Sequence, residues 1–207
     1  MPTKSDEFRS SLTKYLPEFD LSLTDVQIDL CLRHYELMVK WNRSINLSRI
    51  TEPDEAARFH YCESMFADRF LPSEAGTADL GSGAGFPGIP LSILRPERTI
   101  KLVDSNSKKA IFLKEAVRAL NLTNTKVFSD RFQKLDLTNL IWVTRASEEL
   151  EKNIAELFKS PDPVGLVIFL SDVILKKVFA FEEFGWKLTS TQVPLSKGRF
   201  VVSAQHS

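Results

Sequence analysis

Residues 77–90 hold the side chains and glycines with the clearest capacity for chemistry. Asp79, Gly81, Gly83 and Gly85 stand at alternate positions, directly after a short apolar run and before the apolar run that follows. Glycine lets the backbone take a positive φ and lets a ligand approach the main chain closely. The start of a helix offers free N–H groups to a polar ligand. The spacing therefore predicts a strand, a loop and a helix that hold a nucleotide-like cofactor, with a plain tight turn as the alternative.

Two kinds of nucleotide cofactor fit this stretch. Gly83, Gly85 and Gly88 match the G-x-G-x-x-G pattern of dinucleotide-binding proteins, which is a weak signal when it stands alone. Asp79 lies two residues before Gly81 and completes a D-x-G-x-G-x-G run, which looks like motif I of the class I S-adenosylmethionine (SAM) methyltransferases. The position of this aspartate favours SAM.

Two further polar residues are expected at the same edge of the sheet. Asp104 follows the apolar run 99–103, and a carboxylate at the end of a second strand accepts hydrogen bonds from ribose hydroxyls. Its alternative role is that of a loop acid or helix N-cap. Arg145 ends the run 140–144, and its planar guanidinium suits a cofactor carboxylate or a substrate phosphate. A structural ion pair is the alternative for Arg145, which we otherwise take as the catalytic residue.

The sequence shows no recognisable nucleophile–base pair or metal-ligand cluster. Ser82 lacks the G-x-S-x-G register of a nucleophile elbow, and Cys31 and Cys62 form no metal-binding pattern. Methyl transfer explains this, because a sulfonium is already an activated electrophile and its acceptor needs only alignment and desolvation. Phe86 is expected to pack on the cofactor or on the following helix, and a structural role is favoured for His60.

The rest of the chain supplies the elements that position these residues. Residues 1–76 read as helical, with Thr24 as the N-cap of the longest helix. Helices are expected at 7–15, 24–41, 53–70, 88–95, 107–120, 147–160 and 172–183, and strands at 77–80, 99–103, 125–128, 140–144 and 166–170. Alternating strands and helices are typical of a doubly wound α/β sheet. The tail (186–193 and 200–204, with a turn at Lys197-Gly198) reads as an antiparallel hairpin, which resembles class I methyltransferases more than dinucleotide dehydrogenases.

Composition limits the class of protein. The 207 residues are 43% hydrophobic and 26% charged, which suits one compact unit with a helical cap (1–76) and a SAM-binding methyltransferase domain (77–207). No membrane-spanning run or signal peptide is recognisable, so a cytoplasmic protein is expected. Basic and acidic residues balance at 27 each, but residues 77–145 hold 11 basic and 6 acidic residues. That bias fits either a phosphate-rich substrate or solvated surface.

With these residues in place, the chain resembles the RsmG (GidB) family of small-subunit ribosomal RNA guanine-N7 methyltransferases. The resemblance runs from about Leu23 through Ala146 and is most specific at residues 81–90, where two prolines join the glycine run. Trp41-Asn42, Ile45-Asn46-Leu47, Val103-Asp104-Ser105, Lys108-Lys109, Phe112-Leu113 and Thr144-Arg145-Ala146 agree as well. The resemblance implies methyl transfer from SAM to N7 of a guanine in 16S rRNA, either free or in the small ribosomal subunit. A monomer that needs no metal is expected.

The resemblance also implies which residues contact SAM. They are Gly81 and Phe86, the pair Phe132-Gln133 beside the adenine, and Arg145.

Three positions depart from the family pattern. Gln133 stands where a glutamate is usual, and its amide oxygen still accepts a hydrogen bond although the charge is gone. Leu140 replaces an aspartate, and Ser171-Asp172 replaces Lys-Gly after the fifth strand. These departures keep open a paralogue that binds SAM or RNA without turnover. An NAD-dependent oxidoreductase is disfavoured by the hairpin and by the position of Asp79.

Overall fold

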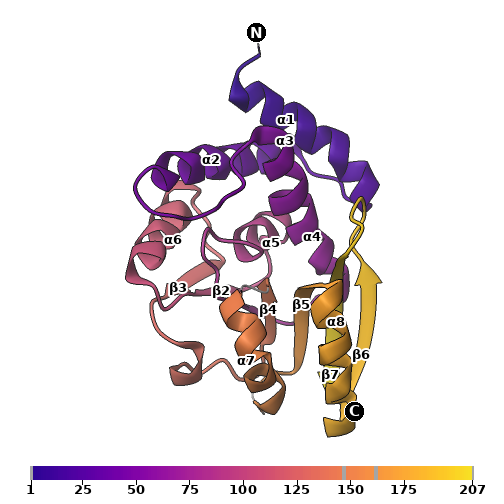
Figure 1. Cartoon of the computed structure of the whole chain (residues 1–207). Coiled ribbons are helices and arrows are strands. Elements are labelled where there is room, and N and C mark those ends of the chain that lie inside the picture. The colour runs from indigo at the N-terminus through magenta and orange to yellow at the C-terminus, as the bar shows by residue number, and fades with distance from the viewer. Residues whose placement is uncertain (1, 146–147, 161–162, 207) are drawn as a thin grey trace.

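The central sheet has seven strands in the order β3-β2-β1-β4-β5-β7-β6 (Figure 1). The computed structural model describes residues 2–145, 148–160 and 163–206. The strands are β1 (Thr77–Leu80), β2 (Ile100–Val103), β3 (Thr125–Phe128), β4 (Ile141–Arg145), β5 (Gly165–Ser171), β6 (Trp186–Gln192) and β7 (Arg199–His206). Strands β1 to β5 are parallel, and β7 lies antiparallel between β5 and β6. This confirms the predicted α/β fold with a C-terminal hairpin, whereas a dinucleotide dehydrogenase continues with parallel βα units.

Helices flank the sheet and form a separate layer at the N-terminus. They are α1 (Lys4–Tyr15), α2 (Asp25–Asn42), α3 (Pro53–Glu55), α4 (Glu63–Phe66), α5 (Gly88–Leu94), α6 (Ser107–Ala119), α7 (Glu148–Lys159) and α8 (Asp172–Val178). Short 3-10 helices span Leu16–Phe19, Ala67–Phe70, Phe132–Lys134 and Phe179–Phe184. Thr24 caps α2 as expected, because its hydroxyl accepts from the Gln27 amide and the Gln27 side chain accepts from the Thr24 amide. None of the described helices is long and apolar enough to cross a bilayer.

The expected boundaries agree with the structure to within a few residues, with two differences of kind. The helix expected at 53–70 is continuous but changes its winding, since a π-helical stretch (Ala56–Cys62) separates α3 from α4. The helix expected at 172–183 ends as α-helix at Val178 and continues as a 3-10 helix. π-Helical turns are frequent at functional sites, and this one carries His60.

Two hydrophobic clusters cover the two faces of the sheet. The first joins the N-terminal helices to the sheet and to the helices α5 and α6. It includes Phe8 and Met38 of the N-terminal helices, Leu102 of β2, Ile89 of α5 and Phe112 of α6. The second packs α7 and α8 on the other face, around Trp142 and Trp186. Figure 1 shows α1 to α4 gathered at one end of the sheet, beside α5 and α6. The helical layer therefore shares its hydrophobic core with the sheet, at the end where the candidate site lies.

Candidate functional site

The loop after β1 has an open half and a packed half. Gly81 has a φ of +72°, and a Cβ added there would meet no atom within 4 Å. A Cβ added at Gly88 would instead meet the Leu102 side chain and would lie 2.7 Å from a carboxylate oxygen of Asp79. Gly88 is thus required for close helix–strand packing, whereas Gly81 leaves space beside a backbone that only glycine adopts easily. The open half is the part that a ligand could occupy.

Asp79 fixes the packed half. Its side chain is fully buried, and Oδ2 accepts a hydrogen bond of 2.9 Å from the Gly88 amide at the start of α5. The other oxygen, Oδ1, has no hydrogen-bond partner among the described residues. Burial raises the pKa of Asp79 to about 7, although the Gly88 hydrogen bond opposes the shift. The aspartate that indicated SAM in the sequence is therefore an anchor of the loop.

Asp104 joins the end of β2 to the glycine loop. Its Oδ2 accepts from the Gly83 amide and its Oδ1 from the Asn106 amide, both at 2.8 Å. The N-cap of α6 is Asn106, whose side chain accepts from two amides of the first turn. Asp104 is therefore not a helix cap, and the structure places it beside the open half of the loop as the ribose hypothesis requires. Each of its oxygens keeps a further lone pair for a ligand.

Arg145 lies at the end of β4, next to the glycine loop. The ends of β4 and β1 are joined because the Thr144 hydroxyl donates to the Leu80 carbonyl at 2.8 Å. The Arg145 guanidinium donates to Nδ1 of His60 at 3.2 Å and lies 3.5 Å from Oε2 of Glu63. Arg145 thus lies in the crevice at the strand ends and forms an ion pair with Glu63 of α4, while its role toward a cofactor or substrate stays a prediction.

His60 belongs to this site, although the sequence favoured a structural role for it. Its ring stacks on Phe86, with 4.3 Å between centroids and 12° between planes. Burial lowers its pKa well below the usual value, and the nearby Arg145 lowers it further. Because Nδ1 accepts from Arg145, the proton of the neutral ring lies on Nε2 and is donated to the Ser48 hydroxyl at 2.7 Å. No local motif could have linked His60 to Arg145, which follows it by 85 positions.

Phe86 packs on the helical layer, and its contact with the cofactor stays a prediction. The side chain is 6% exposed and contacts Tyr61 and His34 as well as His60. His34 also holds the loop directly, since its Nε2 lies 3.1 Å from the Ala84 carbonyl while its Nδ1 accepts from the Tyr61 hydroxyl at 2.9 Å. Burial lowers the pKa of His34 to about 3, so the ring is neutral. Helix α2 thus positions the glycine loop through a buried histidine.

Phe132 and Gln133 follow β3, on the far side of β2 from the glycine loop. The Phe132 ring packs edge-on against Trp142, with 5.5 Å between centroids. The Gln133 amide nitrogen donates to Glu156 of α7 at 2.8 Å, so a carboxylate lies near the position where the family has one. These contacts lie apart from those that Arg145 makes with His60 and Glu63, and the adenine role of the pair remains a prediction.

The other departures from the family pattern lie at opposite ends of the strands. Leu140 precedes β4 at the edge of the sheet away from the crevice, where its side chain packs close to Gly76. Ser171 ends β5 on the crevice side and pairs in register with Arg199 of β7. Ala146, part of the predicted Thr-Arg-Ala segment, lies outside the described residues.

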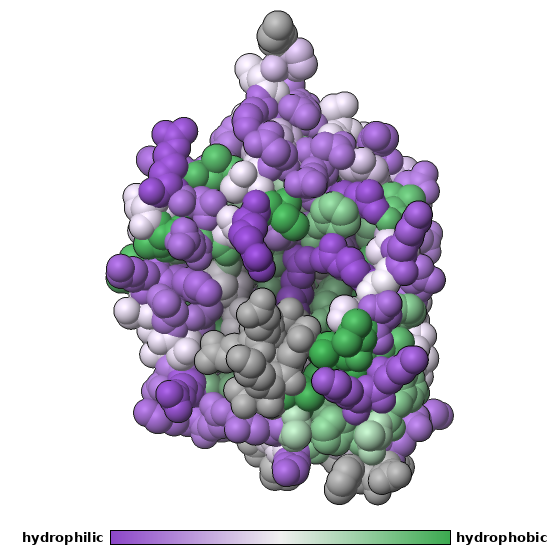
Figure 2. Space-filling view, viewed as in Figure 1, coloured by the Kyte–Doolittle hydropathy of each residue, from purple (hydrophilic) through white to green (hydrophobic). Residues whose placement is uncertain are grey.

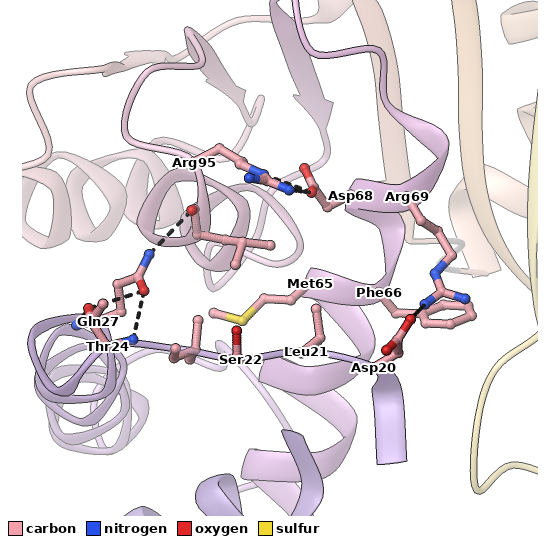
Figure 3. A pocket seen from close by; sticks show the side chains of 12 residues that line it. Asp20, Leu21, Ser22, Thr24, Gln27, Met65, Phe66, Asp68, Arg69 and Arg95 are labelled. Atoms are coloured by element: carbon pink, nitrogen blue, oxygen red, sulfur yellow. Dashed lines mark hydrogen bonds and ion pairs between the residues drawn. The ribbon is translucent and has the colours of Figure 1, made fainter. Parts of the chain in front are cut away.

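A separate pocket of about 620 Å³ lies between the helical layer and the C-terminal end of α5 (Figure 3). Its charged side chains pair with one another, Arg95 with Asp68 and Arg69 with Asp20. None of the predicted site residues lines it. Among the described residues, no group of three or more His, Cys, Asp or Glu side chains is placed to hold a metal ion.

Comparison with known proteins identifies the family. The family model described as rRNA small subunit methyltransferase G (GidB) matches residues 27–187. The chain belongs to this family. A ribosomal RNA small subunit methyltransferase G of Dichelobacter nodosus is 47% identical over 104 residues, 50% of this chain and 49% of that protein. Its counterpart in Desulforamulus reducens is 39% identical over 123 residues, 58% of this chain and 51% of that protein. The chain thus spans about half the length of the curated relatives it matches.

Solved structures agree with the fold of this RsmG-family chain. A SAM-dependent methyltransferase of Aquifex aeolicus superposes with a TM-score of 0.59 at 20% identity, over 74% of this chain and 93% of that one. A precorrin-6y C5,15-methyltransferase of Geobacter metallireducens gives 0.57 at 14% identity, over 84% and 98%. The class I methyltransferase fold expected from the sequence is therefore confirmed.

Proposed function

We propose that this RsmG-family protein transfers a methyl group from SAM to N7 of a guanine in 16S ribosomal RNA. The observation that carries the proposal is the convergence of Gly81, Asp104 and Arg145 at the carboxyl ends of β1, β2 and β4 in a chain of this family. In open α/β sheets ligands bind in this crevice. When bound, SAM supplies a methyl group already activated by a sulfonium charge.

The residues of the crevice fit SAM. The space beside Gly81 admits a ligand against the main chain, and the free lone pairs of Asp104 can accept from ribose hydroxyls. The buried Oδ1 of Asp79, which has no hydrogen-bond partner among the described residues, lies in β1 just before this loop. Gln133 keeps its amide oxygen for the adenine, because only its nitrogen is used by Glu156. Arg145 holds either the cofactor carboxylate or the substrate.

The acceptor atom explains why this crevice needs no general base. Guanine N7 carries a lone pair and no proton, so the protein has only to hold the base edge-on and exclude water. An arginine bound to both O6 and N7 would block that lone pair. Both terminal nitrogens of Arg145 already contact His60 and Glu63, and we assign its guanidinium to the cofactor, a phosphate or O6. We take the protein to act as a cytoplasmic monomer.

Chemical cleavage of rRNA tests the proposal. N7-methylguanosine is reduced by borohydride and the strand is then cut by aniline, so rRNA from cells with and without this gene is compared on a sequencing gel. One extra cut in 16S rRNA is expected when the gene is present, and identical patterns would contradict the substrate assignment. SAM binding by the purified protein without that cut would favour the paralogue without turnover, to which Gln133, Leu140 and Ser171 point.

A further inference from the structure

Three arginines surround one buried carboxylate at the edge of the crevice. Glu63 of α4 is 1% exposed and pairs with Arg199 of β7 at 2.8 Å and with Arg145 of β4 at 3.5 Å. Arg58, in the π-helical stretch, also lowers the pKa of Glu63 by its charge, against the larger effect of burial. The helical layer, the central sheet and the C-terminal hairpin each contribute one arginine.

The ion pairs of this cluster join more arginines than carboxylates. Among the side chains that the structure describes (residues 2–145, 154–160, 163–182 and 185–205), Glu63 is the one carboxylate that forms an ion pair with any of the three arginines. Burial lowers the pKa of Arg145, and the charges of Glu63 and Asp79 oppose that shift. His60 adds no negative charge, because it is neutral and accepts from Arg145. A partly buried cluster with more cations than anions is costly without a counter-ion. The cluster is therefore a candidate site for an anion.

The outer part of the cluster is a stack of flat groups. The guanidinium of Arg58 lies 4.5 Å from the centroid of the Phe59 ring, and that of Arg199 lies 5.0 Å from the same ring. Arg58 also donates to the carbonyl of Leu195, in the turn between β6 and β7, and its buried Nε has no partner within the described part of the chain. The stack therefore links the helical layer to the hairpin in a preset arrangement.

We propose that Arg58, Phe59 and Arg199 bind the backbone and one base of single-stranded RNA beside the nucleotide that is methylated. The proposal rests on the function proposed above. Arginine pairs with phosphate through two parallel hydrogen bonds. Unstacked RNA bases stack on aromatic rings and guanidinium planes. Glu63 is the positioning residue that holds Arg145 and Arg199 in one orientation.

The surroundings of the stack suit an RNA strand. Figure 2 shows hydrophilic side chains around a hollow on the face where the strands end, with hydrophobic surface beside it over α8. Val173 of α8 is 69% exposed and Leu195 is 45% exposed. An RNA strand that enters the crevice here can pair its phosphates with the arginines and pack its bases on the apolar surface.

Binding measurements on single variants test this site. We compare Arg58→Gln, Arg199→Gln and Phe59→Leu in the full chain, with a labelled single-stranded oligoribonucleotide at several salt concentrations and with SAM by calorimetry. Arg118→Gln is the matched control, since Arg118 of α6 is exposed and pairs with Glu115. Each site arginine variant should bind RNA roughly three- to tenfold more weakly, with a salt slope smaller by about one. Phe59→Leu should lose about tenfold at an unchanged slope.

Three outcomes would overturn the proposal. The first is RNA affinity and salt slope that are the same in the wild type, the site variants and the control. The second is loss of SAM affinity at unchanged RNA affinity, which would assign the arginines to the cofactor carboxylate. The third is a wild type that binds no single-stranded RNA. If Arg199→Gln does not fold, Arg199→Lys replaces it in the test. This variant should bind RNA more weakly than the wild type, because lysine cannot form two parallel hydrogen bonds with a phosphate, while the salt dependence of RNA binding stays the same because the charge is kept. The rRNA cleavage assay decides the proposed function separately, whichever result is obtained here.

Discussion

Asp104 is the residue whose position most directly supports a nucleotide ligand. It follows β2, reaches the glycine loop and keeps lone pairs on both oxygens. The hydrogen bond to Gly83 adds a second task, since the same carboxylate that would hold the ribose also holds the loop that would line the cofactor. Asp104 is thus expected to affect both the shape and the affinity of the site.

Asp104→Ala should lower SAM affinity about tenfold or more, because a charge-assisted hydrogen bond contributes about 1.5–3 kcal/mol. Calorimetry measures the affinity, and a melting curve shows whether the variant is folded. Asp29→Ala is the control, since Asp29 is exposed on α2 and pairs with Arg9. Unchanged affinity in a folded Asp104→Ala protein would rule out the ribose role.

Arg145→Lys is expected to reduce methyl transfer strongly while the melting temperature changes by only a few degrees. The guanidinium reaches both His60 and Glu63, and a single ammonium group cannot reproduce that planar, two-partner contact. Arg95→Lys, at an ion pair with Asp68 outside the crevice, is the matched control. If Arg145→Lys instead loses most of its stability with activity per folded molecule intact, Arg145 is a structural residue.

Asp79 makes the fold sensitive to pH in a defined direction. Its pKa is raised by burial to about 7 in the folded protein, from an ordinary value of 3.8. Between these values the folded state keeps a proton that the unfolded state releases, so the contribution of Asp79 to stability falls as pH rises from about 4 to 7. Asp79→Asn removes this titration and keeps an acceptor for Gly88.

The melting temperature of Asp79→Asn minus that of the wild type should therefore increase from pH 4 to pH 7 and then level off. Thermal melts in a series of buffers measure this difference. A difference that stays constant with pH would show that Asp79 has an ordinary pKa in the folded protein.

The loop between β1 and α5 is the element on which the site depends most, and its two halves should respond differently to the same substitution. Gly88→Ala forces a methyl group against Leu102 and Asp79, and overpacking of this kind costs about 1–3 kcal/mol. Gly81→Ala meets no neighbour, but its left-handed backbone costs about 1–2 kcal/mol for a residue with a Cβ.

We expect both variants to be less stable, and Gly81→Ala to lose SAM affinity in excess of its loss of stability because its methyl group enters the ligand space. Melting curves and calorimetry with SAM separate the two effects. Equal SAM affinity in Gly81→Ala and the wild type would show that the ligand does not lie against this part of the loop.

At the scale of the whole molecule, the helical cap and the methyltransferase domain share apolar and polar contacts across their boundary. The sequence predicted that these two parts form one compact unit. One hydrophobic cluster runs from the helices of residues 1–76 to α5, α6 and the sheet. His34 and His60 carry polar contacts across the same boundary, to Ala84 and Arg145. Cap and methyltransferase domain are therefore expected to fold together.

A fragment of residues 77–207 should lack a cooperative melting transition and show poor dispersion in its NMR spectrum. Without the helical layer, Phe86, Ile89 and Phe112 would be exposed to water. Each Å² of apolar surface that becomes exposed lowers the free energy of unfolding by about 25 cal/mol. The full chain is the control. A fragment with a dispersed spectrum and a sharp transition would show that the domain boundary at residue 77 separates independent folding units.

Local patterns in the chain were enough to predict most of the fold. The change from helical periodicity to alternating strands and helices at residue 77, and the final pair of strands, predicted the sheet and its antiparallel hairpin. Thr24 and the glycine run marked a helix start and a loop through hydrogen-bonding and backbone preferences that depend on few neighbours. The same reasoning placed Asp104 and Arg145 at strand ends, since parallel strands end at one edge of a sheet.

The partners of those residues depended on contacts between distant segments. His60 and Glu63 of the helical layer meet Arg145 at the end of β4, and Glu63 also pairs with Arg199 of β7. No spacing in the sequence reports that packing. Burial then changed the chemistry of side chains whose types were already known, raising the pKa of Asp79 and lowering that of His60. Desolvation and charge pairing depend on three-dimensional distances, which is why the candidate anion site became visible only in the folded chain.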